Sequence, residues 1–131
     1  MNKAKPANYP VFEQCCNYFG ECINRHFLDG DDYCITASSV LSRYGLREGK
    51  DLDYLHRGAQ IGGHPLVDSH NEYSKGRYTL SIDDILYNPD NHFYFNGIKY
   101  VSLRVVKDLK EKRGEPKDKK DLELINELLS L

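Results

Sequence analysis

Apolar residues in the first part of the chain recur at two different spacings. Over residues 10–27 they return every three or four positions, which predicts an amphipathic helix whose first turn contains Pro10. The run LDGDD at 28–32 predicts a turn, and the apolar run YCIT at 33–36 is typical of a short buried strand. The pattern therefore predicts a helix followed by a strand.

Two further short elements follow. The segment SSVLSRYGL at 38–46 predicts a helix that is capped by Ser38 or Ser39 and ends at Gly45. The segment KDLDYLH at 50–56 alternates polar and apolar residues, which predicts a strand. Because side chains of a strand point alternately to its two faces, the two aspartates of this segment share one face.

The middle of the chain has the weakest periodicity. Residues 57–77 are rich in glycine, histidine and polar residues, so we expect a long loop, which in a compact domain is more often functional than idle. The segment YTLSIDDILYNPDN at 78–91 fits two alternatives, a strand followed by a helical turn or a short helix capped by Ser81.

The C-terminal third predicts a hairpin and two helices. Asn96-Gly97, between apolar, aromatic and β-branched residues, is a strong hairpin signal. Ser102 caps a predicted helix over 103–112, the segment RGEP ends it, and Pro116 begins a last helix. The expected fold class is α/β (α+β), with a mixed sheet flanked by helices and two helices at the C-terminus.

Length and composition narrow the class of protein. The 131 residues predict a single domain over residues 10–131, preceded by a flexible leader over residues 1–9. A net charge of −2 indicates neither a nucleic-acid partner nor a membrane surface. No apolar run reaches membrane-spanning length and the N-terminus lacks a signal-peptide core, so we expect a cytoplasmic protein. The cysteines show no zinc-ligand spacing and are expected to be small buried residues: Cys15, Cys16, Cys22 and Cys34.

Asp51 and Asp53 are the first candidates for chemistry. Two carboxylates on one strand face repel each other, and a divalent cation removes that conflict. Hard oxygen ligands suit Mg²⁺ or Mn²⁺, which proteins commonly hold with one or two carboxylates and the phosphates of a substrate. The serines at the upstream helix start favour a phosphate. The pattern indicates a site for a metal-bound nucleoside triphosphate, and solvated acids on an exposed strand face are the alternative.

The segment ITASSVLSRYGLREGKDLDYLH resembles the signature of the nucleotidyltransferase superfamily, the DNA polymerase beta type. In that family a Gly-Gly or Gly-Ser turn precedes a strand of the pattern acid–apolar–acid–apolar. Here Ala37-Ser38 takes the place of the turn, and Asp51 and Asp53 match the acids. The resemblance implies that Ala37, Ser38 and Ser39 bind the nucleotide, and that the two acids are catalytic and bind Mg²⁺ or Mn²⁺.

A second segment, FNGIKYVSLRVVKDLKEKRGEPKDKKDLELI, resembles the part of many minimal members in which an Arg-x-x-x-Lys-Asp-x-x-Asp run follows a strand and a helix. The matching residues here are Arg113, Lys117, Asp118 and Asp121. Lys117 and Arg113 are candidates to grip a phosphate of the nucleotide, because arginine gives bidentate contacts and lysine a point charge. The alternative is an ion-pair network with the two aspartates that fixes the last helix to the sheet.

Active members of this family use a third carboxylate from a later strand as metal ligand and general base. Asp83 is the first choice for this catalytic residue, with Asp84 and Asp68 as alternatives. Three histidines of the middle segment are further candidates for a metal or phosphate contact, with surface or capping roles as the alternative: His64, His70 and His92.

The resemblance implies Mg²⁺-dependent transfer of a nucleoside monophosphate from a nucleoside triphosphate to an acceptor hydroxyl that the sequence does not identify. A catalytically inactive domain of the same fold, used for nucleotide sensing or for binding a protein partner, is the alternative, because Ala37 adds a methyl group where the family has glycine. A third interpretation is the sugar-nucleotide metal site of a glycosyltransferase, which the short chain disfavours.

Overall fold

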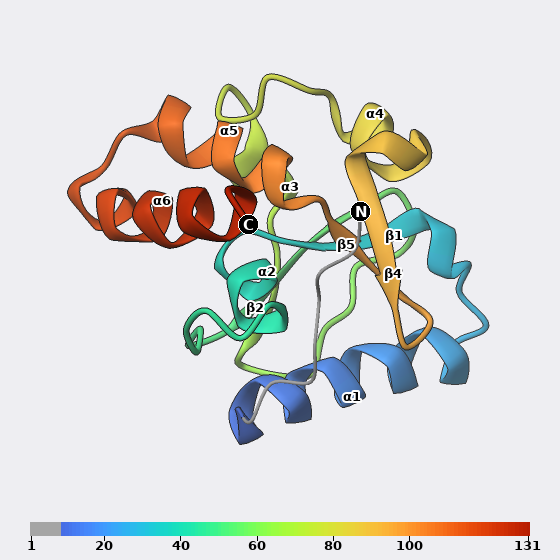
Figure 1. Cartoon of the computed structure of the whole chain (residues 1–131). Helices are drawn as coiled ribbons and strands as arrows, with labels where there is room; N and C mark the ends of the chain where they lie inside the picture. The colour runs from blue at the N-terminus through green and yellow to red at the C-terminus, as the bar shows by residue number, and fades with distance from the viewer. Residues whose placement is uncertain (1–8) are drawn as a thin grey trace.

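The computed structural model describes residues 9–131 and contains a mixed five-stranded sheet surrounded by helices (Figure 1). Its strands are β1 (Tyr33–Thr36), β2 (Leu52–His56), β3 (Val67–Ser69), β4 (His92–Phe95) and β5 (Ile98–Val101). Their order across the sheet is β3-β2-β1-β5-β4. The pairs β1–β2 and β4–β5 are antiparallel, whereas β1–β5 and β2–β3 are parallel. The predicted α+β class with a mixed sheet is confirmed.

The described chain also contains six α-helices and two short 3₁₀ turns. They are α1 (Pro10–Arg25), η1 (Gly30–Asp32), α2 (Ser38–Arg43), α3 (Asn71–Ser74), α4 (Ile82–Tyr87), η2 (Pro89–Asn91), α5 (Leu103–Arg113) and α6 (Pro116–Leu129). Proline in the first turn of α1 and of α6 confirms both predicted starts, since proline lacks the amide hydrogen that a first turn leaves unpaired. The two predicted C-terminal helices are confirmed as α5 and α6.

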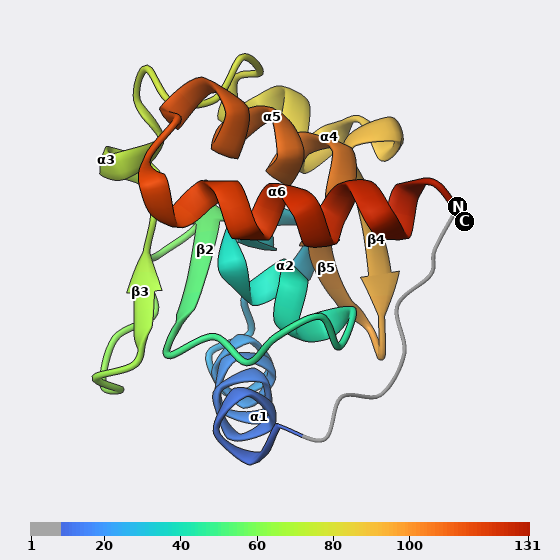
Figure 2. The same cartoon turned by 60° about the vertical axis from the view of Figure 1, so that its left-hand side comes forward.

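The sheet separates two clusters of buried side chains. One packs against α1 and contains Phe12 and Phe19 of that helix and Tyr54 of β2. The other contains residues of α2, α4, α5 and α6, such as Leu109 and Ile125. In Figure 2, α1 lies below the sheet and α5 and α6 lie above it. All four cysteines are buried and free, as expected for small apolar residues.

The alternation of side chains along β2 decides where the aspartates point. Leu52 and Tyr54 belong to the cluster under α1, whereas Leu55 belongs to the cluster under α5 and α6. Asp53 therefore faces the same side as Leu55, toward the two C-terminal helices. This confirms a strand in which Leu52 points away from the neighbouring acid.

The predicted hairpin is present between β4 and β5. Asn96 and Gly97 form its turn with φ angles of 50° and 77°, the left-handed pair that a two-residue type I′ turn requires. Ser102 then caps α5, because its hydroxyl accepts a hydrogen bond from the amide of Val105. Gly114, with φ of 63°, ends that helix.

Two expectations need correction. Residues 57–77 are not one long loop, because they contain β3 and the single turn α3. The segment 78–91 contains no strand; Ser81 caps α4, which was the second of the two alternatives.

Residues 1–8 of the predicted leader lie outside the described residues. Tyr9, the last residue of that leader, donates a hydrogen bond to the carbonyl oxygen of Gly45 at 3.3 Å. Among residues 9–131, no helix combines the length and the apolar character that a membrane span requires.

Candidate functional site

A pocket of about 470 Å³ lies where the start of β2 meets the start of α2 and the adjoining ends of α5 and α6. We call it the Asp53 pocket. Asp51, Asp53, Ala37, Ser38 and Lys117 line it, so the structure brings together the two predicted acids, the predicted phosphate turn and the predicted phosphate-binding lysine.

Asp53 lies in β2 and Asp51 directly precedes this strand, which begins at Leu52 rather than at residue 50 as predicted; a third acid joins them from the edge strand. Asp53 and Asp68 are direct neighbours across the parallel β2–β3 pair. One carboxylate oxygen from each of Asp51, Asp53 and Asp68 lies within 4.8 Å of the others. We call these three residues the acidic triad. Carboxylates at this separation suit a divalent cation with oxygen ligands.

The electrostatics of the acidic triad are unfavourable without a cation. Burial raises the pKa of Asp53 to about 7, and the negative charges of Asp51 and Asp68 add to the rise. Arg113 and Lys110 oppose the rise, but they are too weak to cancel it. A positive charge placed among these oxygens therefore relieves a conflict that the fold itself leaves in place.

Asp83, the first choice for the third carboxylate, lies elsewhere. It is an exposed residue of α4, and its Oδ1 is 2.6 Å from Nε of Arg57, beyond the far end of β2. Asp84 is also exposed and lies beside it on α4. The structure instead brings Asp68, the last of the three alternatives, to the predicted pair. Its sequence signal was the segment PLVDS, in which two apolar residues precede an acid as they would in a short strand.

Ala37 adopts a backbone conformation that favours glycine. Its φ of 59° and ψ of −141° place it as the N-cap of α2. The prediction that Ser38 or Ser39 caps this helix is wrong, because both serines lie within its first turn and the cap itself has no side-chain acceptor. The resemblance expects glycine at this same position, and the positive φ gives the physical reason.

The two serines after Ala37 have different surroundings. Ser39 is 1 % exposed, and its hydroxyl donates to the carbonyl oxygen of Asp51 at 3.2 Å and accepts from the amide of Asp53 at 3.1 Å. It therefore fixes the acidic strand against α2 and does not face the pocket. Ser38 is partly exposed and lines the Asp53 pocket.

A buried group of opposite charges lies behind Ser38. Lys110 is 1 % exposed, and its Nζ lies 3.0 Å from Oδ2 of Asp121 and 3.5 Å from Oδ1 of Asp118. Arg47 pairs with both carboxylate oxygens of Asp121, at 2.6 and 2.8 Å, and Arg113 pairs with both of Asp118. We call these five residues the ion-pair network. Of the two alternatives for Arg113, the ion pair is present with Asp118, whereas Asp121 is held by Arg47 and Lys110 and Lys117 takes no part in an ion pair among residues 9–131.

Pairing lowers the pKa of both network aspartates. Burial alone would raise the pKa of Asp121, but hydrogen bonds from Arg47 and Lys110 outweigh it. Burial opposes the shift in Asp118 as well, and the Arg113 hydrogen bonds again prevail. Lys117 is exposed, lines the Asp53 pocket and has no ion-pair partner among residues 9–131, so it remains available to a ligand.

Arg47 and Lys110 were not among the predicted site residues. The signal for Lys110 was its position, since it follows Leu103 and Val106 at the spacing of the buried face of α5. A lysine at a core position needs a buried partner. Arg47 lies in an irregular segment between α2 and β2, where no periodicity marks it.

Of the three candidate histidines, only His70 borders the Asp53 pocket. Its Nδ1 lies 3.7 Å from Oδ2 of Asp53, its ring packs on Tyr73, and its Nε2 is buried without a hydrogen-bond partner. Burial, with nearby Arg113, lowers the pKa of His70 to about 4, so the contact with Asp53 is not an ion pair at neutral pH. The ring of His64 accepts a hydrogen bond from the amide of Leu66, and Nδ1 of His92 bonds to the carbonyl oxygen of Ile85.

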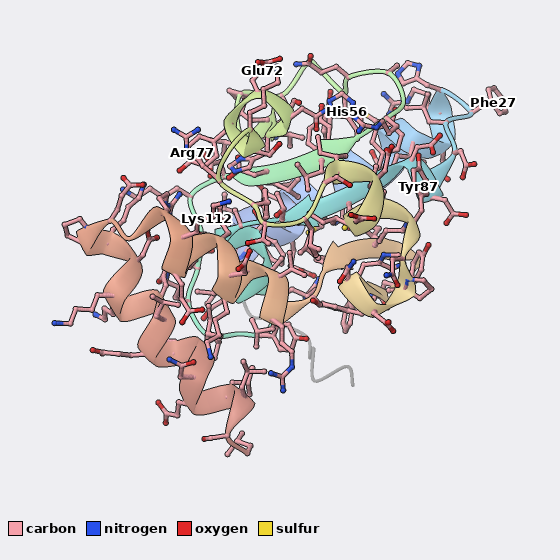
Figure 3. The ribbon with its side chains drawn as sticks, turned by 90° about the horizontal axis from the view of Figure 1, so that it is seen from above. Phe27, His56, Glu72, Arg77, Tyr87 and Lys112 are labelled. Atoms are coloured by element: carbon pink, nitrogen blue, oxygen red, sulfur yellow. The ribbon has the colours of Figure 1, made fainter. Side chains whose placement is uncertain are left out.

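The segment after β3 packs against the end of α5. Lys112 donates to the carbonyl oxygen of Tyr78 at 3.4 Å, and Arg113 donates to the hydroxyl of Tyr73. Figure 3 shows Arg77 and Lys112 on one side of the molecule, away from Phe27 and Tyr87. This packing closes the Asp53 pocket on the side of His70.

No profile of a known protein family matches the chain, and neither curated proteins nor solved structures gave a match. Function is therefore inferred from the residues of the site and their chemistry.

Proposed function

We propose that this protein is a Mg²⁺- or Mn²⁺-dependent nucleotidyltransferase that moves a nucleoside monophosphate from a nucleoside triphosphate to an acceptor hydroxyl. The observation that supports this proposal most is the position of Asp68 on β3, directly beside Asp53 of β2. It supplies the third carboxylate from a later strand that the resemblance requires.

The donor set fits a hard divalent cation. Asp51, Asp53 and Asp68 offer only carboxylate oxygens, and no cysteine lies among them. Burial, together with the charges of Asp51 and Asp68, raises the pKa of Asp53, and a cation among these oxygens would offset that shift. When bound, Mg²⁺ would neutralise the phosphates of the nucleotide and act as a Lewis acid at the reacting phosphate.

The remaining residues of the pocket suit the other parts of the reaction. Ser38 and the exposed cation Lys117 line the side on which the triphosphate would bind. The acceptor oxygen forms a bond to the α-phosphorus, the bond to the bridging oxygen breaks, and pyrophosphate leaves. Asp68, exposed on the edge strand, takes the proton of the acceptor hydroxyl.

A second candidate function is a catalytically inactive domain of this fold that senses a nucleotide or binds a protein partner. The observation that favours it is Ala37, whose methyl group occupies a turn that glycine suits better. This function predicts nucleotide binding without release of pyrophosphate, or no nucleotide binding.

The test is a thermal-stability titration with ATP, GTP, CTP and UTP, with and without Mg²⁺, followed by an assay for pyrophosphate. A ligand of the folded state raises the Tm according to its affinity. We expect a Mg²⁺-dependent rise with at least one triphosphate, which the double variant D51N/D53N loses and the control D83N retains. A rise that survives D51N/D53N would contradict the proposed site. A Mg²⁺-dependent rise without any pyrophosphate would favour the second function.

A further inference from the structure

The hydroxyl of Ser38 accepts hydrogen bonds from two cations. Nη2 of Arg47 lies 2.9 Å from its Oγ, and Nζ of Lys110 lies 3.4 Å away. Guanidinium and ammonium groups only donate, so each contact occupies a lone pair of the oxygen. A hydroxyl has two lone pairs and one proton, and here both lone pairs are engaged.

The hydroxyl proton of Ser38 remains available to donate a hydrogen bond. Among residues 9–131, this hydroxyl donates no hydrogen bond. Ser39 differs, because its hydroxyl both donates and accepts within the protein. The proton of Ser38 must point away from Arg47 and Lys110, and the residue is partly exposed on the wall of the Asp53 pocket.

The two cations are themselves fixed. Asp121, 4 % exposed, holds Arg47 through two hydrogen bonds and Lys110 through one ion pair. The carboxylate of Asp121, on α6, therefore holds both of the side chains that donate hydrogen bonds to Ser38. Rotation of the Ser38 hydroxyl toward either cation would oppose two donors to one another.

We propose that Arg47 and Lys110, held by Asp121, are positioning residues that orient the Ser38 hydroxyl as a hydrogen-bond donor to a phosphate oxygen of the nucleoside triphosphate. This inference rests on the proposed function. Phosphate oxygens only accept hydrogen bonds, so a hydroxyl fixed with its proton outward matches them without reorganisation on binding. The charge of the buried network thereby acts on the ligand through Ser38.

The experiment measures the affinity of the full chain for ATP, GTP, CTP and UTP in the presence of Mn²⁺, and separately its affinity for Mn²⁺ alone. We expect S38A to bind the triphosphate about tenfold more weakly, the loss of one charge-assisted hydrogen bond, with unchanged Mn²⁺ affinity. Ser130, an exposed serine at the end of α6, supplies the matched control S130A, which should bind both ligands as the unchanged chain does.

A double-mutant cycle tests the role of the cations. K110M and R47M should each weaken triphosphate binding, and neither should add a further loss in the background of S38A, because both act through the same hydroxyl. R47M keeps the test valid should K110M fail to fold, since Arg47 is partly exposed. A purely structural role would lower the Tm without this dependence on Ser38.

Two outcomes would overturn the inference. In the first, the unchanged chain binds a triphosphate and S38A binds it equally well, which leaves the proposed function standing. In the second, R47M weakens binding by the same factor with and without Ser38, which means that the cation acts on the phosphates directly. Failure of the unchanged chain to bind any triphosphate would instead contradict the proposed function together with this inference.

Discussion

Two groups of aspartates contribute to the wall of the Asp53 pocket, the acidic triad through Asp51 and Asp53 and the ion-pair network through Asp121. The fold gives these two groups opposite electrostatic surroundings. The acidic triad places like charges together, and burial with those charges raises the pKa of Asp53 to about 7. The ion-pair network surrounds Asp118 and Asp121 with three cations, of which Lys110 is buried, and the pKa of each aspartate is lowered despite burial. The spacing of the aspartates along the sequence therefore does not by itself distinguish a ligand site from a structural ion-pair group. What distinguishes them is whether the fold provides the counter-charge.

The two groups should also differ in how they affect the free energy of unfolding. A buried ion pair whose partners remain together contributes little net free energy, but removal of one partner leaves an unpaired buried charge. Crowded carboxylates, in contrast, destabilise the protein until a cation binds. The network should therefore respond to mutation as a structural unit, and the acidic triad as a site that lowers stability when no metal is bound.

The largest effect is expected from the network. K110M leaves two buried carboxylates without their shared cation, so we expect a loss of about 3 kcal/mol in the free energy of unfolding, measured with urea at pH 7. Lys107, on the same helix and partly exposed, gives the control K107M, which should lie within about 0.5 kcal/mol of the unchanged chain. A loss under about 1 kcal/mol for K110M would show that the network does not behave as a buried ionic unit.

The stability lost in D121N should depend on pH, because the pKa of Asp121 is lower in the folded chain than in the unfolded chain. A carboxylate whose pKa falls on folding stabilises the protein above its unfolded pKa, near 4, and this contribution is lost as the pH falls through the folded value. D121N should therefore cost about 2 kcal/mol at pH 7 and clearly less at pH 3, in urea unfolding at both pH values. An equal cost at both pH values would exclude the ionic explanation.

The effect of D53N on stability should depend on pH in the opposite direction, because the pKa of Asp53 is higher in the folded chain than in the unfolded chain. Between about pH 4 and pH 7 the unfolded chain loses the proton of Asp53 while the folded chain retains it, so the metal-free fold becomes less stable as the pH rises. The variant lacks this loss and should be about 2 kcal/mol more stable than the unchanged chain at pH 8 in the presence of a chelator. At pH 4 the difference should disappear. Destabilisation by D53N at pH 8 would contradict the account of the triad.

The smallest stability effect concerns Ala37. Its positive φ is strained for any residue except glycine, so A37G should stabilise the fold by about 1 kcal/mol despite the extra freedom of the unfolded chain. Ala59, an exposed alanine with no positive φ, gives the control A59G, which should not stabilise. Triphosphate binding should also strengthen in A37G, because the backbone can approach the ligand more closely. A lower free energy of unfolding for A37G would mean that the turn is not strained.

Much of the fold could be predicted because its signals are local. Asn96-Gly97, Ser102 and Pro116 each act through their own backbone geometry, so their elements appear where the sequence places them. The strand β3 was missed because it has only three residues and gains its stability from pairing with β2, which no local pattern reports. Ser38 was wrongly expected to cap α2 for a related reason, since the bend at Ala37 moves the start of the helix by one residue.

The site residues, too, could be predicted only where their signal is local in the sequence. Asp51 and Asp53 could be identified from the sequence because they are only two residues apart, Asp51 directly before β2 and Asp53 within it. Asp68 joins them only through the parallel pairing of β3 with β2, and the sequence favoured Asp83, which lies in a stronger local pattern on α4. Lys110 completes the network from another helix, and its meaning depends on the aspartates that α6 brings to it.

The measurement that tests the central claim most directly is the affinity of the chain for Mn²⁺, followed by electron paramagnetic resonance, in D68N and D83N. Both residues are exposed aspartates, and the pair of Asp83 with Arg57 is a surface contact of small energy. The account predicts that D68N weakens Mn²⁺ binding about tenfold or more, while D83N leaves it unchanged. Equal affinities in the two variants, or a loss confined to D83N, would show that Asp68 does not complete the site.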